Sequence, residues 1–423
     1  MIGVELERPF PLGFGVLHQL PRVIYTIEVD NDGDLIKGFG EASIDFPFSH
    51  YDAYDVYSAL QNLELEGQSI QNREKILNSS AIREDLLINT PAAFCALNMA
   101  LDDALGRSVG KSVIDIYGGK KRLGLRALSS LSFKENDMDL VNEASILFQG
   151  GFIPKVKLGR GVERDLITLS ILDKNTPDEF RFAVDFNAQY SDGDSEEFLH
   201  FLSLSKFDYK KVIFWEQPTI SEGGVGLLLD FKKGLSTLDS DAIVIADESF
   251  VNYNDALKCA LNNIGLNYKI HKVGGIYIAK EIEGKLKEKN LLGEISMVGG
   301  TFPTAIGRTY DRQAACVLES TNLPSDGVEP STDWFKGEKH FIKEDFPQKT
   351  KEDLFSPHEG SGLGVNVEEG KIRRFRINDP EKEYRQIRTD QSGDQLKIEL
   401  KEGEKYSKVY RSLADKDSLW NLK

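Results

Sequence analysis

Three acidic residues end three short apolar runs of the chain. Asp185 follows "RFAV", Glu216 follows "VIFW" and Asp247 follows "AIVIA", at equal intervals of 31 residues. If these runs are neighbouring parallel strands, the carboxylates meet at one edge of the sheet, where their repulsion calls for a divalent cation. Oxygen ligands without cysteine or histidine favour Mg²⁺ over Mn²⁺ or Ca²⁺. Taken singly, each acid could equally be a solvated or helix-capping residue.

Lysines accompany this carboxylate cluster. Lys155 and Lys157 in "FIPKVKLG" lie two apart and share one face of a strand, and "NYKIHKVGG" contains Lys269 and Lys272. Lys157 on the second strand and Lys269 on the sixth would face each other across the cation, so that one removes a proton and the other returns one. A lysine base needs a lowered pKa, which burial and a second ammonium group, here Lys155, can provide. The alternative is a pair of exposed lysines on an edge strand. His271 is interpreted as structural.

The elements that must position these residues begin near residue 125. Seven short apolar runs alternate there with helical stretches, a pattern typical of a parallel sheet, and seven or eight such units imply a closed (β/α) barrel of the TIM type. Strands of such a barrel are buried on both faces, so a charged residue at a strand's carboxyl end marks the mouth, where active sites lie. The alternation stops after about residue 335.

The first 65 residues have another pattern. "RVIYTIEV" (22–29) followed by "DNDGD" (30–34) predicts a hairpin of an antiparallel sheet, and hence an α+β region. In "NTPAAFCALNMALDDALG" we expect a largely buried helix that Thr90 caps, that has Pro91 in its first turn and that ends before Gly106. Near the C-terminus, "QLKIELKEG" (395–403) could form one more hairpin arm.

Composition narrows the partners. The 423 residues carry 68 acidic against 52 basic side chains, a net charge of −16 that disfavours nucleic acid and anionic membranes. The three cysteines, Cys95, Cys259 and Cys316, lie far apart in apolar contexts, so no disulfide framework is indicated. With neither a signal peptide nor a long apolar segment in the sequence, we expect a cytoplasmic location.

Taken in order, several of these motifs resemble the enolase superfamily, and within it the muconate lactonizing enzyme subgroup, which includes dipeptide epimerases, o-succinylbenzoate synthases and N-acylamino acid racemases. The resemblance rests on "GFGEAS" (38–43), "ALNMALDDALG", "KVKLG", "VDFN", "WEQP", "ADES", "KIHKVGG", "MVGG" and "GLGV" (362–365). It implies Asp185, Glu216 and Asp247 as Mg²⁺ ligands, and Lys157 and Lys269, rather than Lys272, as the acid/base pair. Asn187 and Glu248 would lie next to the metal ligands.

The resemblance also implies a capping domain that closes over the barrel. We expect residues 1–124 to form it, residues 125–335 to form the barrel, and residues 336–423 to return to the capping domain and end in a charged extension. Two of its loops, 11–21 and 45–52, would select the substrate. Candidate substrate contacts are Lys155, Asp326, Phe14, His18 and Phe48.

Two departures from the family pattern limit the assignment of a substrate. "MVGG" continues as "TFPTAIGR" (301–308), without the acidic residue that follows soon in dipeptide epimerases. Those enzymes also bind the dipeptide ammonium with an Asp-x-Asp on the last strand. Here "SDGVEP" keeps Asp326 and has Val328 at the second position.

The sequence therefore predicts an Mg²⁺-dependent enzyme that abstracts the α-proton of a small carboxylate, most simply a racemase or epimerase of amino-acid or dipeptide derivatives, and a homo-oligomer. One alternative is a syn-dehydratase of the o-succinylbenzoate synthase type, with Lys157 as base and then acid. The other is an inactive barrel that serves as a binding or structural protein. The complete set of carboxylates and lysines argues against the latter.

Overall fold

The computed structural model describes residues 1–12, 15–31, 33–44, 49, 51–119, 126–131, 133–134, 136–221, 224–328, 341–347, 354–378 and 388–389. For residue 5, 7–12, 15–19 and 388–389 only the backbone is described. The predicted boundaries near 124 and 335, the substrate-contact candidates Phe14 and Phe48, and the hairpin arm 395–403 lie outside these ranges. No helix within them is long and apolar enough to cross a bilayer.

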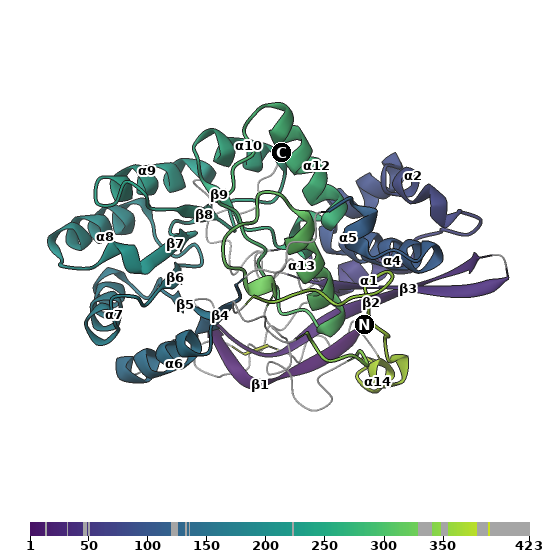
Figure 1. Ribbon diagram of the computed structural model, residues 1–423, viewed down its shortest axis with the longest axis horizontal. Coiled ribbons are helices and arrows are strands. Elements are labelled where there is room, and N and C mark those ends of the chain that lie inside the picture. Colours follow the sequence, from purple (N-terminus) through teal and green to yellow (C-terminus); the bar gives the residue numbers. More distant parts are fainter. Residues whose placement is uncertain are drawn as a thin grey trace, which may run out of the picture.

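An antiparallel sheet forms the N-terminal part (Figure 1). Strand β2 (Gly15–Asn31) pairs with β1 (Ile2–Leu12), with β3 (Asp34–Ser43) and with β10 (Arg388–Thr389). The hairpin predicted from "DNDGD" is the β2–β3 connection. The chain also returns to β1, because Gly3 donates its backbone N–H to the Phe375 carbonyl, 3.0 Å away. The N-terminal sheet thus includes C-terminal residues, as the predicted fold class requires.

Helices complete this part of the molecule. Ordered along the chain they are α1 (Ala53–Gln61), η1 (Ile70–Asn72), α2 (Arg73–Leu77), α3 (Ser80–Ile82), the π-helical turn η2 (Arg83–Ile88), α4 (Pro91–Val109) and α5 (Val113–Ile116). The start of α4 was predicted correctly. Thr90 precedes it, but among the described residues the Thr90 hydroxyl has no hydrogen-bond partner, so the predicted side-chain cap is wrong.

The predicted end of α4 at Gly106 is also wrong. The helix continues to Val109 and ends at Gly110, whose φ of 66° lies in the left-handed region that favours glycine at a helix end. Gly106 instead allows a close approach, because a Cβ there would lie 2.6 Å from the Cα of Gly362. The glycine signal was real, but it marks packing against the C-terminal "GLGV" segment.

A parallel sheet of six strands follows, in the order β4-β5-β6-β7-β8-β9. The strands are β4 (Leu128–Leu131), β5 (Ile153–Lys157), β6 (Phe182–Asp185), β7 (Val212–Glu216), β8 (Val244–Ala246) and β9 (Gly265–Leu266). Helices on the outside of the sheet connect them (Figure 1). They are α6 (Asp137–Gln149), α7 (Val162–Asn175), α8 (Asp192–Leu204), α9 (Gly224–Ser236) and α10 (Tyr253–Leu261).

Single parallel bridges close the sheet into the predicted barrel. Asn267 pairs with Met297, Ser296 with Thr321, and Ser325 with Ala127, the residue before β4. These bridges stand where a seventh and an eighth strand would. Helices α11 (Ile270–Val273), α12 (Ile276–Glu288) and α13 (Ala305–Val317) belong to this last part of the ring, and α14 (Glu369–Arg374) follows it in the chain.

The barrel interior is apolar at the level of the strands. One buried cluster contains a residue from each of β4 to β8 and Met297 of the closing segment: Leu128, Ile153, Ala183, Phe214, Ile245 and Met297. Above this level, Lys157, Asp185 and Glu216 stand at the carboxyl ends of β5, β6 and β7, the end of the barrel where active sites lie. The prediction that Lys269 lies on the sixth strand is wrong, since β9 ends at Leu266 and Lys269 is the residue that precedes α11.

Candidate active site

The three predicted metal ligands lie side by side at the carboxyl ends of adjacent strands. Asp185 ends β6, Glu216 ends β7 and pairs with it in register, and Asp247 directly follows β8. All three are buried, with exposed fractions of 1%, 0% and 1%. They form a row across three strands, which from here on we call the carboxylate row.

Two lysines of β5 reach the row from one side. The Lys157 ammonium nitrogen lies 2.5 Å from Asp185 Oδ2. The Lys155 nitrogen lies 2.7 Å from Asp326 Oδ2 and 3.1 Å from Glu216 Oε2. Because β5 lies between β4 and β6 and both lysines are buried, the alternative of exposed lysines on an edge strand is wrong. "KVK" is the charged carboxyl end of a strand that lies inside the sheet.

Lys269 and Lys272 reach the row from its other end. Lys269 Nζ lies 2.7 Å from Asp247 Oδ2, and Lys272 Nζ lies 2.6 Å from Asp247 Oδ1 and 2.7 Å from the Asp247 carbonyl oxygen. The short helix α11 turns the backbone so that residues three apart point the same way. Both lysines therefore share one carboxylate, and this geometry by itself does not favour either as the acid/base group.

Burial and neighbouring charge oppose each other along the row. Burial alone would raise the pKa of Asp185 and Asp247, but the adjacent ammonium groups, Lys157 for Asp185 and Lys269 for Asp247, override it and hold both below their usual range. At the centre of the row, burial and the charge of Asp185 raise the pKa of Glu216 to about 7. Burial would lower the pKa of Lys155, yet the carboxylates of Asp326 and Glu216 raise it well above the ordinary value. Lys155 thus serves as a buried counter-ion.

The chemistry of these groups fits a hard divalent cation. Five carboxylates meet four ammonium groups here, so the cluster formally has one excess negative charge; its members are Asp185, Glu216, Asp247, Glu248, Asp326, Lys155, Lys157, Lys269 and Lys272. A divalent cation would change that excess to one positive charge, which suits a substrate carboxylate. Lysines and amides hydrogen-bond to the oxygen atoms of the row. Among the described residues, no three side chains that could bind a metal ion gather around one point. Lys157 and Lys269 would have to move away from the carboxylates of Asp185 and Asp247 for the cation to bind there.

Polar neighbours orient the carboxylates. Asn187, which has a φ of 46°, donates its backbone N–H to Asp185 Oδ1 over 2.8 Å, so it lies where the sequence predicted. Two further residues were missed: the Asn267 amide donates to Glu216 Oε1 over 2.6 Å, and Gln217 Oε1 accepts the Asp247 N–H over 2.9 Å. Gln217 follows directly in "WEQP" and could have been suspected. Asn267 is 51 residues from Glu216, and only the barrel brings them together.

Glu248 is the least satisfied group of the site. Both of its carboxylate oxygens are buried without a hydrogen-bond partner among the described residues. Burial and the charge of Asp247 raise its pKa well above the ordinary value, while the Lys269 ammonium opposes this rise. Glu248 directly follows Asp247, one of the predicted metal ligands, but it does not hold any of these ligands in place through a hydrogen bond that the structure describes.

Among the substrate-contact candidates, Asp326 reaches the site. It pairs with Lys155 and accepts the Gly300 N–H, 2.9 Å from its Oδ1. Val328, where dipeptide epimerases would have a second aspartate, is buried, and its carbonyl accepts a hydrogen bond from Arg312. The backbone of His18 lies in β2, and its side chain is outside the described part.

A buried polar junction joins the N-terminal sheet to the barrel. Glu41 of β3 accepts hydrogen bonds from the backbone of Thr304 and Gly307 at the start of α13, both over 2.8 Å. His271 Nδ1 faces the Ser43 N–H at 3.3 Å, and burial with the charge of Arg22 lowers its pKa to about 3. His271 therefore stays neutral and structural, as predicted.

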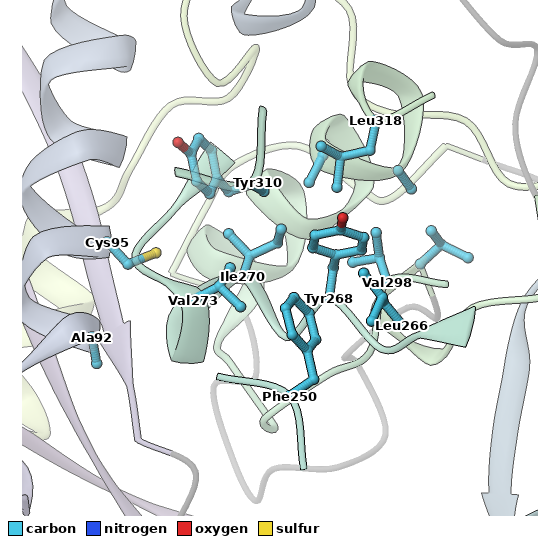
Figure 2. Close-up of a cluster of buried hydrophobic side chains, with 14 of the residues drawn as sticks. Ala92, Cys95, Phe250, Leu266, Tyr268, Ile270, Val273, Val298, Tyr310 and Leu318 are labelled. Carbon is cyan, nitrogen blue, oxygen red and sulfur yellow. The ribbon is translucent and has the colours of Figure 1, made fainter. Parts of the chain in front are cut away.

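Apolar packing reinforces this junction next to the lysines. Figure 2 shows Ile270 and Val273 of α11 between Cys95 of α4 and the aromatic ring of Tyr268. These side chains are all buried. The segment that contains Lys269 and Lys272 is therefore clamped between the capping helix α4 and the barrel, which fixes where both ammonium groups can reach.

The chain is similar in sequence to several known enzymes. No family model matches the chain. An N-succinyl-L-Arg/Lys racemase of Bacillus cereus is 21% identical over 313 residues, which cover 72% of this chain and 80% of the racemase. Other sequence relatives are named dipeptide or amino-acid epimerases and chloromuconate cycloisomerases.

The solved structures that superpose on the chain agree in fold. A muconate lactonizing enzyme of Pseudomonas fluorescens has a TM-score of 0.75 at 20% identity and covers 89% of this chain and 97% of its own. A dipeptide epimerase of Enterococcus faecalis, complexed with Mg and L-Leu-L-Tyr, has a TM-score of 0.70 at 20% identity and covers 86% and 97%. In sequence the chain is thus similar to racemases, epimerases and cycloisomerases, and in fold it is similar to muconate lactonizing enzymes and dipeptide epimerases.

Proposed function

We propose that the protein is an Mg²⁺-dependent racemase or epimerase of an amino-acid or dipeptide derivative. The observation that supports this most is the placement of Lys157 and Lys269 at opposite ends of the carboxylate row, at Asp185 and Asp247. An enzyme that inverts a carbon centre by proton transfer needs one proton acceptor and one proton donor on different sides of that carbon. Lys157 at the end of β5 and Lys269 after β9 meet this need, because β6, β7 and β8 lie between them in the sheet.

In this proposal the lysines exchange roles with the direction of reaction. Neutral Lys157 takes the α-proton of one stereoisomer while the Lys269 ammonium gives a proton to the opposite face, and the reverse holds for the other stereoisomer. Asp185, Glu216 and Asp247 would hold the cation, which when bound neutralises the charge that develops on the substrate carboxylate. The Lys155 ammonium group would balance the negative charges of Glu216 and Asp326. Asp326 would also accept a hydrogen bond from a donor group of the substrate.

The test uses solvent exchange. Racemic N-succinyl amino acids and L-alanyl dipeptides are incubated with the protein and Mg²⁺ in D₂O, and α-deuteration is followed by NMR and chiral chromatography. Lys157→Ala and Lys269→Ala should each abolish epimerisation, while each variant still exchanges the α-proton of one stereoisomer, a different one in each variant. Lys111→Ala, an exposed lysine outside the barrel mouth, is the matched control. If both lysine variants epimerise like the native protein, the acid/base assignment is wrong.

A cycloisomerase reaction is the second candidate, because a chloromuconate cycloisomerase of Pseudomonas sp. is 24% identical over 390 residues, which cover 89% of this chain. In that case a lactone forms from a muconate and no amino-acid derivative exchanges its proton. Loss of water from the succinylbenzoate precursor would instead indicate the syn-dehydratase. A cytoplasmic location, a homo-oligomer and substrate contacts by Phe14, His18 and Phe48 remain predictions.

A further inference from the structure

A cavity of about 410 Å³ opens beside the carboxylate row, between the capping helices and the barrel. This volume lies within the roughly 300–1,000 Å³ of small-molecule pockets. Its inner end is lined by Glu248 and Lys272, the residues next to Asp247 and in contact with it. The inner end of the cavity therefore lies next to Asp247 of the carboxylate row. We call it the η2–α12 pocket, after the elements on either side of it.

Apolar side chains from both parts of the molecule line the middle of the pocket. Leu87 comes from η2 and Pro91 from the first turn of α4, while the barrel side contributes from the loop after β8 and from α11 and α12: Val251, Val273, Ile278 and Ile282. Figure 1 shows α12 between α10 and the capping helices. A substrate group that enters here contacts these apolar side chains, which favours an apolar group.

The charged residues at the outer end are already paired with each other. Glu281 Oε2 lies 2.6 Å from Arg83 Nη2, and Glu281 Oε1 lies 2.8 Å from Lys285 Nζ. Lys285 also lies over the ring of Tyr253, 5.2 Å from its centroid. A charged side chain in the pocket would lose its hydration without finding a free partner among these groups. At the inner end, Glu248 lies next to Lys272, whose ammonium group pairs with Asp247.

Asp326 marks the opposite part of the barrel mouth. It pairs with Lys155 of β5, whereas the pocket lies next to β8 and β9, so β6 and β7 lie between the two in the sheet order. A substrate with its reacting carbon above the carboxylate row would direct one substituent toward Asp326 and another into the pocket. In an amino-acid derivative these are the nitrogen-linked part and the side chain.

We propose that the η2–α12 pocket binds the side chain of the reacting residue, and that this side chain is uncharged, largely apolar and at least as large as that of leucine. The inference rests on the proposed racemase or epimerase function. It makes Val251, Leu87 and Ile282 specificity-determining residues, because they surround the space that the side chain fills.

The experiment compares side chains in two series, N-succinyl amino acids and L-alanyl dipeptides, with alanine, leucine, lysine or glutamate as the reacting residue. In the native protein kcat/KM for α-proton exchange should be at least about tenfold higher for leucine than for alanine, since each buried methylene is worth tenfold or more. Val251→Phe fills the pocket and should lower this leucine-to-alanine ratio at least about tenfold. Val109→Phe makes the same change at an exposed position outside the pocket and should leave the ratio unchanged.

Calorimetry separates a failure of the pocket from a failure of the proposed function. Binding of N-succinyl-L-leucine and N-succinyl-L-alanine with Mg²⁺ is measured for the native protein and for Val251→Phe, without turnover. Tighter binding of the leucine compound that Val251→Phe removes supports the pocket even if no substrate exchanges its proton, which would refute only the proposed function. A preference for lysine or glutamate, or equal binding of both compounds, would overturn the inference.

Discussion

At the scale of single residues, the site is a set of buried charges that balance each other. Lys155 holds the centre of this balance, since its ammonium group lies within 4 Å of Asp185, Glu216 and Asp326. Such a group cannot be removed alone without leaving buried carboxylates uncompensated. The residue predicted from "KVK" as a modulator of Lys157 therefore also has a structural role, which its buried position beside three carboxylates explains.

Lys155→Met should destabilise the metal-free protein by about 3–5 kcal/mol, because the removal of one partner from a buried ion pair leaves an uncompensated buried charge. Mg²⁺ should restore part of this loss by supplying positive charge at the same carboxylates. Thermal unfolding with and without Mg²⁺ measures both effects. Lys210→Met, an exposed lysine at the other end of the barrel, is the control. Equal melting temperatures for Lys155→Met and the native protein would contradict the role of Lys155.

His271 gives a pH dependence with a definite sign. Its pKa is lowered to about 3 in the folded protein from 6.5, so the unfolded chain binds a proton that the folded one does not between these values. Stability is fully present above pH 6.5 and falls with decreasing pH by up to about 1.4 kcal/mol per unit from this group.

His271→Asn should remove this component, because an asparagine oxygen can accept the Ser43 N–H but does not titrate. Urea unfolding of both proteins at pH 4 to 7 gives the two slopes. A shallower slope for the variant is expected, and parallel slopes would show that His271 is protonated in the fold.

Residue types and spacing were enough to predict the carboxylate row and its lysines, because a strand's carboxyl end must face the barrel mouth. They could not reveal that Lys155 pairs with Asp326, 171 residues away, or that Asn267 holds Glu216. Contacts between such distant residues depend on how the ring closes. The same limit applies to Lys269 and Lys272: spacing along a regular strand would put them on opposite faces, whereas the helical turn α11 brings both to Asp247.

At the scale of elements, the contact between β3 and α4 positions the capping sheet. Gly38 and Gly40 of "GFGEAS" let the strand lie directly on the helix backbone, and a Cβ on Gly40 would lie 1.9 Å from the Ala96 carbonyl oxygen. The neighbouring Glu41 then reaches the start of α13. In the motif "GFGEAS", the two glycines thus allow close packing of β3 on α4, and Glu41 then attaches the strand to the start of α13.

Gly40→Ala should therefore shift β3 away from α4 and destabilise the protein by about 1–3 kcal/mol, as overpacking of a tight core does. Gly33→Ala is not a suitable control, since its φ of 92° is itself strained for alanine. Gly226→Ala in α9, where a Cβ meets nothing within 4 Å, provides the matched comparison. Chemical denaturation gives both free energies of unfolding, and equal values would mean that the strand and helix can separate without cost.

Element types were predictable from periodicity, but element ends were not. Helix α4 passes Gly106 because the glycine is needed for contact with Gly362, and β9 stops at Leu266 because the chain turns into α11. At Gly106 a tertiary contact, rather than local preference, determines the boundary.

At the scale of the whole molecule, the fold brings a capping sheet made from both ends of the chain over one end of a barrel. The η2–α12 pocket exists only between these two parts, so no stretch of sequence could have predicted it. The barrel itself was predictable, since the alternation of apolar strands and helices repeats along the chain.

The excess negative charge of the site predicts a response of the whole molecule to metal. Mg²⁺ at 100 times its dissociation constant should raise the free energy of unfolding by about 2.7 kcal/mol, and chelation should reverse this. Asp185→Asn should weaken the response, whereas Asp192→Asn, an exposed residue at the start of α8, should not. Thermal shifts across a Mg²⁺ titration provide the measurement, and equal shifts for Asp185→Asn and the native protein would contradict the predicted metal site.

In the proposed reaction, two lysines at opposite ends of one carboxylate row transfer protons to opposite faces of one carbon. The most direct measurement is stereospecific α-proton exchange in D₂O by Lys157→Ala and Lys269→Ala with Mg²⁺. Each variant should deuterate one stereoisomer, a different one for each lysine, and neither should interconvert them. Exchange of the same stereoisomer by both variants, or continued interconversion by either, would contradict the proposed reaction.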